Sequence, residues 1–307
     1  MQAIGAVDIG GTKIALGLVS IRGQVLASLA LPSQPEKSFL LDMLEIAAGL
    51  DRLLAQTNAD LLGIGLGCTG QVNSVSGEVL KNGFLPHWAG QNPARWLSEH
   101  YEVSTALEND ADAAALAEWQ WGAGSGASRF IYLTVSTGIG AGLIFDGQVY
   151  RGAGGAHPEI GHHTIEPSGP TCFCGNRGCW EAVASGRALS ARLQSLLPDF
   201  NRDAAAVCDL AEAGHPLAQQ AVAAHGQALG VGLANLITLY APDTIALGGG
   251  LMSRAALFLP AIQVNLAERC RLISAVHTRL ALSHFGANTG LAGAAMAWVH
   301  RQAQAKA

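Results

Sequence analysis

The sequence contains one supersecondary pattern twice, and this duplication constrains the fold more than any other feature. Residues 6–18 read as a strand, a glycine turn and a second strand, and a further turn at Arg22–Gly23 leads to residues 24–26. Residues 133–144 repeat this order, with Asp146–Gly147 as the second turn before residues 148–150. Apolar runs joined by such turns are typical of β-hairpins. The alternative is a chance likeness of two hairpins; we interpret the repeat as two related domains.

Helical and strand-like patterns alternate along the rest of the chain, which favours an α/β class. We expect helices over residues 39–54, 93–100, 110–121, 187–197, 204–213, 217–240, 257–267 and 290–301. We expect strands over residues 61–66, 102–107, 244–247 and 279–282. The 307 residues are enough for two domains. The glycine-rich segment 122–126 is the best candidate for a linker.

Composition argues against several classes of protein. The formal net charge is −5 and no basic run is present, which argues against nucleic-acid binding. Asp8 interrupts the apolar start, so the N-terminus does not resemble a signal peptide. No apolar run reaches membrane-spanning length, and the segment 228–239 contains Asn235 and Thr238. The cysteines outside residues 157–181 show no framework spacing, so we expect a reducing, cytoplasmic location.

Three of the six cysteines lie close together, at Cys172, Cys174 and Cys179. Thiolates at this C-x-C-x4-C spacing suit Zn²⁺, and one histidine would complete a closed tetrahedral site. His162 and His163 are both near enough in sequence, and the spacing does not choose between them. A closed site predicts a structural metal. Three free thiols are one alternative, and a disulfide is a weaker one because Cys172 and Cys174 are too close to pair without strain.

The tip of each hairpin has the chemistry of a phosphate cradle. At the first tip, Gly10 and Gly11 let backbone N–H groups approach an anion, and Lys13 adds a positive charge. The spacing is not that of a Walker A loop, and a plain β-turn is the alternative. The second tip, residues 137–140, repeats the pattern. Two tips facing each other across a cleft would form a stronger site than either alone.

Three further segments each allow two interpretations. Residues 65–70 match G-x-G-x-x-G, but the dinucleotide interpretation, and with it an oxidoreductase, requires a helix where turn-forming residues follow. Residues 248–250 are glycines that would admit a flat ligand, or that form a simple helix-entry loop. Asp110 follows Asn109 where a strand ends and a helix begins. It is either a helix cap or a carboxylate at the floor of a cleft.

Together these motifs resemble the ROK family of sugar kinases and repressors, within the actin-like, hexokinase-like ATPase superfamily. The matching segments are D-x-G-G-T-K from Asp8 to Lys13, N-D at Asn109–Asp110, T-G-x-G from Thr137 to Gly140, E-x-G-H from Glu159 to His162, C-x-C-G-x-x-G-C-x-E from Cys172 to Glu181, and the glycines Gly248 to Gly250. The resemblance implies a two-domain, ribonuclease H-like α/β fold with an interdomain cleft. We assign residues 1–121 and 289–307 to one domain, and 122–288, with the zinc loop, to the other.

The resemblance also implies a role for each matching residue. Asp110 is expected to be the catalytic base. The expected sugar ligands are Asn109, Glu159, His162 and Glu181, and the expected zinc ligands are His162, Cys172, Cys174 and Cys179. ATP is expected to contact Asp8, Gly10, Gly11, Thr12, Lys13, Thr137, Gly138, Gly248 and Gly249. Mg²⁺ would accompany ATP, and family members imply a homodimer or a higher homo-oligomer.

The expected reaction is ATP-dependent phosphorylation of the 6-hydroxyl of a hexose, with glucose as the first candidate. Glucokinase-like members carry an asparagine where this chain has Phe84, with Asn82 two residues earlier, and the turn at residues 68–70 also departs from the common pattern. N-acetylmannosamine or N-acetylglucosamine is therefore the alternative substrate. A non-catalytic sugar sensor is a further alternative. Only seven residues precede Asp8, so we expect no helix-turn-helix of the kind that repressors in the family carry.

Overall fold

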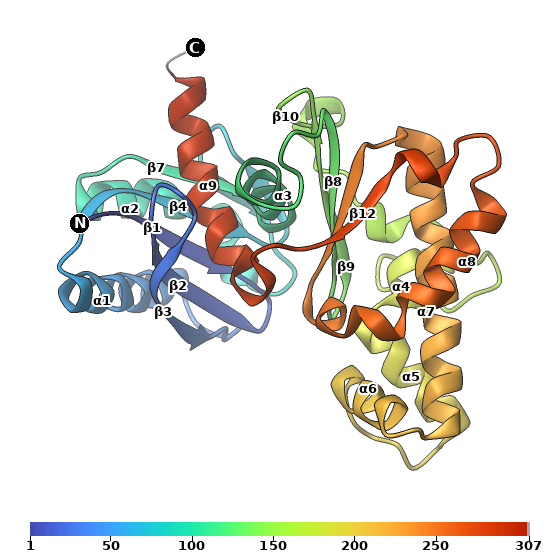
Figure 1. Ribbon diagram of the computed structural model, residues 1–307. Helices are drawn as coiled ribbons and strands as arrows, with labels where there is room; N and C mark the ends of the chain where they lie inside the picture. The colour runs from blue at the N-terminus through green and yellow to red at the C-terminus, as the bar shows by residue number, and fades with distance from the viewer. Residues whose placement is uncertain (306–307) are drawn as a thin grey trace. The chain divides into compact units, whose positions relative to one another are not determined.

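The computed structural model describes residues 1–305, which form two compact units (Figure 1). Unit 1 comprises Met1–Gly126, Gly142–His157 and Ala287–Ala307, and unit 2 comprises Ala127–Ala141 and Pro158–Gly286. The division after Gly126 falls in the glycine-rich segment. Residues 142–157, which we assigned to the second domain, lie with unit 1. The domain boundaries drawn from the sequence stay a prediction.

The first sheet has five strands in the order β3-β2-β1-β4-β7. The strands are β1 (Gln2–Ile9), β2 (Lys13–Val19), β3 (Val25–Pro32), β4 (Asp60–Cys68) and β7 (Thr105–Asn109). The strands β1, β2 and β3 run antiparallel, whereas β4 is parallel to both β1 and β7. A separate ribbon pairs β5 (Gln71–Asn73) with β6 (Glu78–Lys81).

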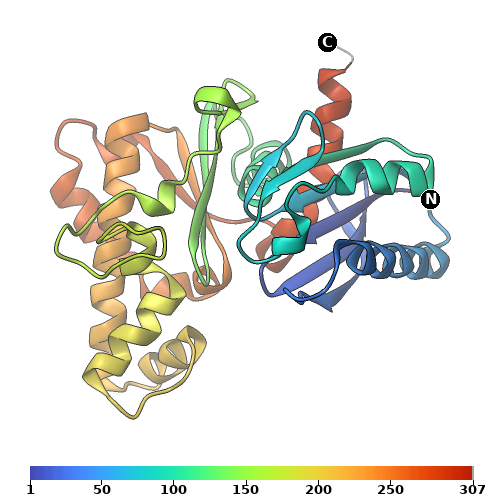
Figure 2. The ribbon, with the colours of Figure 1, turned by 180° about the vertical axis from the view of Figure 1, so that it is seen from behind.

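Helices cover both faces of this sheet (Figures 1 and 2). They are α1 (Phe39–Thr57), α2 (Pro93–Tyr101), α3 (Asp110–Trp121) and α9 (Thr289–Gln304). Successive side chains of a strand point to opposite faces. On β1, Ala3, Val7 and Ile9 therefore join the core beneath α1 and α2, while Ile4 and Ala6 pack against α9. Burial on both faces explains why β1 reads as an almost continuous apolar run.

The second sheet repeats the topology of the first, in the order β10-β9-β8-β11-β12. Its strands are β8 (Arg129–Val135), β9 (Ile139–Phe145), β10 (Gln148–Val149), β11 (Thr244–Gly248) and β12 (Arg279–Leu282). Here too the fourth and fifth strands along the chain run parallel to the first. The duplicated hairpin in the sequence thus marks two sheets of the same topology, and the α/β prediction is confirmed.

The helices of unit 2 gather around one long helix (Figure 2). They are α4 (Trp180–Ala184), α5 (Gly186–Leu196), α6 (Ala204–Glu212), α7 (Pro216–Tyr240) and α8 (Leu259–Arg269). By length and composition α7 could cross a membrane, contrary to our estimate from the sequence, but 56% of its most apolar window is buried inside the protein. Gly232 on α7 leaves room for the Trp180 ring, as expected of a core helix.

One local prediction was wrong, and one alternative that the sequence disfavoured is excluded. The strand expected at residues 102–107 begins only at Thr105, because Glu102 adopts a left-handed conformation that ends α2. The segment 65–70 does not open a helix. β4 continues to Cys68 and β5 begins at Gln71, so the dinucleotide interpretation and the oxidoreductase alternative are wrong.

Candidate active site and metal centre

Two predicted site residues of unit 1, Asp8 and Asp110, lie on either side of β4. Asp8 is paired with Gly67, and the next residue of β4, Cys68, is paired with Asn109, immediately before Asp110. A Cβ atom on Gly67 would lie 3.6 Å from the Cα of Asp110 and 3.7 Å from Oδ1 of Asp8. The glycine therefore lies between the two acids. Burial, and then the negative charge of Asp110, raises the pKa of Asp8 to about 7, while Lys13 opposes the rise.

Asn109, not Asp110, is the N-cap of α3. Its Oδ1 accepts hydrogen bonds from the backbone N–H groups of Ala111 (2.9 Å) and Asp112 (3.2 Å), so the main capping role is filled. Its Nδ2 donates to the carbonyl oxygen of Gly70 (3.2 Å). Asp110 starts the helix, and its Oδ1 also accepts from Ala111 N–H (3.0 Å). Burial raises the pKa of Asp110 to about 6, against the opposing effects of that hydrogen bond and of His157.

A buried ionic network adjoins Asp110, and our reading of the sequence missed it. Arg151 donates one hydrogen bond to Asp112 Oδ2 and another to Glu108 Oε1. Nδ1 of His157 lies 2.7 Å from the same Oδ2 of Asp112, whose side chain is completely buried. The signal in the sequence was Asp112 in an alanine-rich buried helix, where an acid needs partners. The partners themselves, about 40 positions away, could not be identified from the sequence.

The first hairpin tip forms a tight turn in which Gly10 N–H donates to Lys13 O (3.0 Å). Thr12 and Lys13 are exposed. A Cβ atom on Gly11 would lie 2.8 Å from the ring of Phe84, so this glycine lets the aromatic ring lie against the tip. A Cβ atom on Gly290 would overlap the Asp8 carboxylate. Asp8 thus lies at the N-terminus of α9, where the helix dipole favours negative charge.

Asn82 does not take the place of the missing asparagine at position 84. Its Oδ1 accepts from the N–H groups of Phe84 and Leu85 (both 2.9 Å), and its Nδ2 donates to the carbonyl oxygen of Thr69 (3.0 Å). The residue is buried and fixes the loop after β6 against the end of β4. The Phe84 side chain is 45% exposed. The exposed side of this loop is therefore aromatic where an amide was expected.

In unit 2, the second hairpin tip is joined to Glu181. Oε2 of Glu181 accepts a hydrogen bond from Ile139 N–H (2.8 Å), and a Cβ atom on Gly138 would overlap this carboxylate. A Cβ atom on Gly161 would overlap the carbonyl oxygen of Ile139. Gly161 is flanked by Ile160 and His162 in a short 3₁₀ turn that follows the exposed Glu159. The segment 159–162 and α4 are therefore both anchored on the start of β9.

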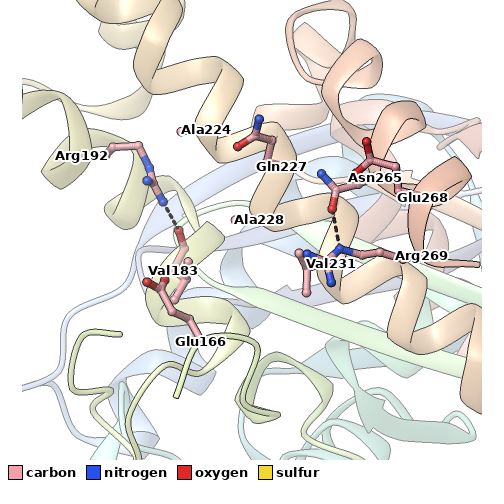
Figure 3. A pocket seen from close by; sticks show the side chains of 10 residues that line it. All are labelled: Glu166, Val183, Arg192, Ala224, Gln227, Ala228, Val231, Asn265, Glu268 and Arg269. Carbon is pink, nitrogen blue, oxygen red and sulfur yellow. Dashed lines mark hydrogen bonds between the residues drawn. The ribbon is translucent and has the colours of Figure 1, made fainter. Parts of the chain in front are cut away.

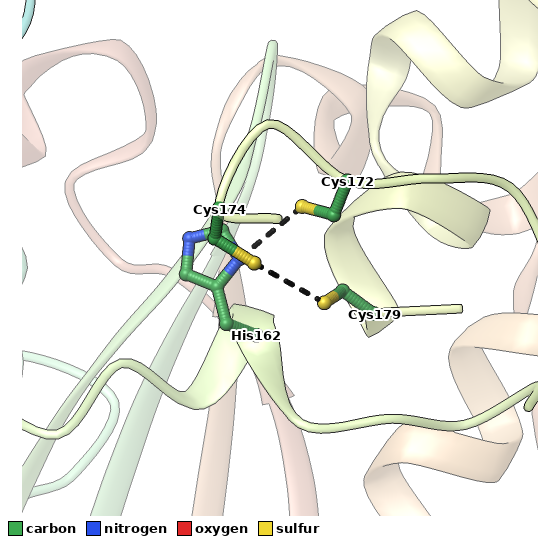
Figure 4. Close-up of side chains that lie close together, drawn as sticks. All are labelled: His162, Cys172, Cys174 and Cys179. Carbon is green, nitrogen blue, oxygen red and sulfur yellow. Dashed lines mark hydrogen bonds between the residues drawn. The ribbon is translucent and has the colours of Figure 1, made fainter. Parts of the chain in front are cut away.

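The predicted metal ligands come together in unit 2 (Figure 4). One ligand atom from each of His162, Cys172, Cys174 and Cys179 lies within 4.8 Å of the other three. Cys172 Sγ is 3.5 Å from His162 Nδ1, and Cys174 Sγ is 3.6 Å from Cys179 Sγ. Ligands of a tetrahedral zinc ion stand roughly 3.5–3.8 Å apart, whereas a disulfide requires about 2.05 Å. The donor set and its spacing fit zinc.

His163, the other candidate ligand, is used elsewhere. Its Nδ1 lies 2.6 Å from the carbonyl oxygen of Ile160, and its Nε2 lies 3.2 Å from Nδ2 of Asn235. The ring also packs edge-on against Trp180. Both nitrogens and one face are therefore committed to structure, so the geometry selects His162 as the ligand.

The glycines at 248–250 have a packing role. A Cβ atom on Gly248 would overlap the Tyr132 hydroxyl, and Gly249 has a φ of +87° with the backbone of Val135 2.5 Å from the position of a Cβ atom. These contacts with β8 are enough to explain why both positions are glycine, so the glycines are not by themselves evidence of a ligand. Contact with ATP at Gly248 and Gly249 stays a prediction.

Two pockets found among the described residues lie away from the predicted site residues. One, of about 420 Å³ in unit 2, lies between α5, α7, α8 and Glu166 (Figure 3). Its polar lining includes Arg192, which donates to Val183 O (3.2 Å), and Arg269, which donates to Asn265 Oδ1 (2.8 Å). The other, of about 580 Å³, lies in unit 1 between residues 74–77, α2 and Arg301.

The ROK family model matches residues 4–302 of this chain. The chain is 32% identical over 275 residues to a glucokinase of Streptomyces coelicolor, covering 84% of each protein. It is 30% identical over 291 residues to an N-acetylmannosamine kinase of Escherichia coli, covering 95% of this chain and 96% of the relative. A xylose repressor of Caldicellulosiruptor bescii is 29% identical over 283 residues, covering 86% of this chain and 69% of the repressor.

Solved structures show the same similarity. A ROK hexokinase from Thermus thermophilus superposes with a TM-score of 0.80 at 32% identity, covering 98% of this chain and all of that one. A ROK glucokinase from Streptomyces griseus, in complex with glucose and AMPPNP, superposes with a TM-score of 0.81 at 29% identity, covering 98% and 99%. The predicted actin-like ATPase fold is confirmed by these likenesses.

Proposed function

Because the chain belongs to the ROK family, we propose that it is a sugar kinase that transfers the γ-phosphoryl group of ATP to the 6-hydroxyl of a hexose, with glucose as the preferred substrate. The observation that carries the proposal is the arrangement of Asp8 and Asp110 around Gly67, beside a glycine hairpin. A carboxylate at a helix start beside a phosphate-binding turn is what phosphoryl transfer to a hydroxyl requires.

In the proposed reaction, Asp110 accepts the proton of the attacking hydroxyl. Burial raises its pKa to about 6, which leaves it mostly ionised at neutral pH and a stronger base than an exposed aspartate. Backbone N–H groups at Gly11 and Gly138 are proposed to bind the phosphates, with Lys13 adding charge. The N–H of Gly10, which was also expected to contact ATP, is donated to Lys13 O within the turn. Mg²⁺ bound with ATP supplies further electrostatic stabilisation. Positioning and electrostatics provide most of the acceleration in phosphoryl transfer.

The sugar is proposed to contact Asn109, Glu159, His162 and Glu181. The N-cap geometry leaves Asn109 one amide hydrogen beyond its bond to Gly70. His162 turns Nδ1 toward the thiolates, so Nε2 is the atom available to a sugar hydroxyl. The cluster of His162, Cys172, Cys174 and Cys179 is proposed to bind a structural zinc ion, which would fix this imidazole in place.

N-acetylmannosamine is the second candidate substrate. The observations that favour it are the 30% identical N-acetylmannosamine kinase and the exposed Phe84 where glucokinase-like members have asparagine. A sugar-sensing protein without catalysis is the alternative suggested by the xylose repressor relative. The presence of Asp110 at the start of α3 argues against it, because a sensor needs no proton acceptor.

The proposal is tested by measuring ADP release with Mg²⁺, ATP and a panel of glucose, mannose, 2-deoxyglucose, fructose, xylose, N-acetylmannosamine and N-acetylglucosamine. We expect glucose to have the highest kcat/KM, mannose a lower one, and 2-deoxyglucose to lose part of the contribution of the 2-hydroxyl. If an N-acetylated hexosamine exceeds glucose tenfold, the kinase assignment stands and glucose is wrong. If no sugar stimulates ADP release, both are wrong.

A further inference from the structure

The acidic end of α3 carries more negative than positive charge. The charged groups of unit 1 that act on Asp110 or its neighbours are the carboxylates Asp8, Glu108 and Asp112 and the cations Lys13 and Arg151. Arg151 is engaged by both Glu108 and Asp112, and these acids raise its pKa. With Asp110 included, four carboxylates face two permanent cations. A further positive charge would lower the free energy of this group when Asp110 is ionised.

His157 is the residue placed to supply that charge. It lies in the segment after β10, and its Nδ1 is 2.7 Å from Oδ2 of Asp112. A buried carboxylate favours the protonated imidazole and fixes its orientation. A positive charge on this ring lowers the pKa of the Asp110 carboxyl and so opposes the negative charge of Asp112, which raises it. Asp112 and Asp110 are two positions apart on α3, so the imidazole lies against the turn that carries the proposed base.

We propose that His157, hydrogen-bonded to Asp112, is a positioning residue for Asp110. Its positive charge stabilises the ionised form of Asp110, which is the form that can accept a proton. The inference rests on the proposed kinase function for its kinetic test only. Arg151 neutralises the structural acids Glu108 and Asp112, while His157 acts on Asp110. The pKa of Asp110 is raised to about 6, so this carboxyl is partly protonated near pH 6 and ionised near pH 8. The rate of phosphoryl transfer should therefore respond to His157 mainly at acidic pH.

The kinetic test compares the pH dependence of kcat in the parent, His157→Gln and His157→Lys, with His277→Gln as the control at an exposed histidine of unit 2. Gln can still donate a hydrogen bond to Asp112 but carries no charge. On the acidic limb of the profile, we therefore expect the pH at which kcat is half-maximal to rise by about one unit. The rate near pH 6 should then fall several-fold more than the rate near pH 8. His157→Lys should keep the limb near that of the parent, and His277→Gln should leave the profile unchanged.

A second readout does not need catalysis. Protein labelled with ¹³C at the aspartate carboxyls is titrated by NMR, and the Asp110 signal is assigned by its loss in Asp110→Asn. We expect the pKa of Asp110 to rise by about one unit in His157→Gln and to return toward the parent value in His157→Lys. An unchanged Asp110 titration, or a loss of rate that is equal at every pH, would overturn the proposal. If no sugar is phosphorylated, the NMR titration still decides it.

Discussion

The carboxylate of Glu181 accepts a hydrogen bond from the backbone N–H of Ile139, at the tip of the second hairpin. A residue implied in sugar binding is thus bonded to the turn implied in phosphate binding, within one unit. The carboxylate also fills the space above Gly138. Removing the side chain would therefore change the hairpin as well as the proposed sugar contact.

Glu181→Gln and Glu181→Ala separate these two effects. Gln keeps an oxygen that can accept from Ile139 N–H but loses the charge, so we expect kcat/KM for glucose to fall by about 10- to 100-fold with the KM for ATP nearly unchanged. Ala leaves the Ile139 N–H without its partner, and we expect a larger loss together with a higher KM for ATP. Steady-state kinetics with each substrate varied would show the difference. Equal effects of the two variants on ATP would contradict it.

Asp110→Asn should keep the shape of the side chain and remove the proton acceptor. We expect kcat to fall by about 10²–10⁴ while the dissociation constant for glucose, measured by calorimetry, changes little. Asp60→Asn, at the highly exposed first residue of β4, is the matched control and should behave like the parent. Turnover of Asp110→Asn within a few-fold of the parent would exclude Asp110 as the base.

Cys174→Ser tests the metal centre. The loop 162–179 has few buried residues of its own, so we expect the variant to lose one bound zinc per chain and to melt about 10 °C or more below the parent. Cys270→Ser, at a cysteine outside the cluster, should keep both the zinc and the melting temperature. The measurements are metal analysis of the purified protein and differential scanning calorimetry. A parent protein without zinc would refute the assignment.

Asp8 should lower stability at neutral pH. Its folded pKa of about 7 lies above the unfolded value of 3.8, so the folded state binds more protons between these values and stability falls as the pH rises through that window. Asp8→Asn removes the buried charge. We expect it to melt a few degrees above the parent at pH 8, with the difference vanishing near pH 4, and to lose activity. A variant that melts below the parent at pH 8 would contradict a destabilising effect of the buried Asp8 carboxylate.

The sequence allowed the two sheets and the grouping of the cysteines with a histidine to be predicted, for reasons visible in single residues. The helix 110–121 was predicted with its observed ends because an alanine run follows Asp110, although the cap is Asn109 and not Asp110. The spacing from Cys172 to Cys179 allowed the candidate metal site to be predicted, because its cysteines are close along the chain. The network of Arg151 and His157 with Asp112 could not be predicted, because its members are distant in sequence and only the packing of β9 and β10 brings them to α3.

The loop that holds Phe84 should influence which sugar is preferred. Asn82 is committed to backbone hydrogen bonds, so Phe84→Asn would introduce an amide at the position where glucokinase-like members have one. One added hydrogen bond is worth about 0.5–1.5 kcal/mol, so we expect the ratio of kcat/KM for glucose to that for N-acetylmannosamine to rise about 2- to 10-fold. Phe84→Leu shortens the side chain without adding an amide and should leave the ratio unchanged. A ratio that rises equally in both variants would show that removal of the aromatic ring from Gly11, rather than the new amide, changes the preference.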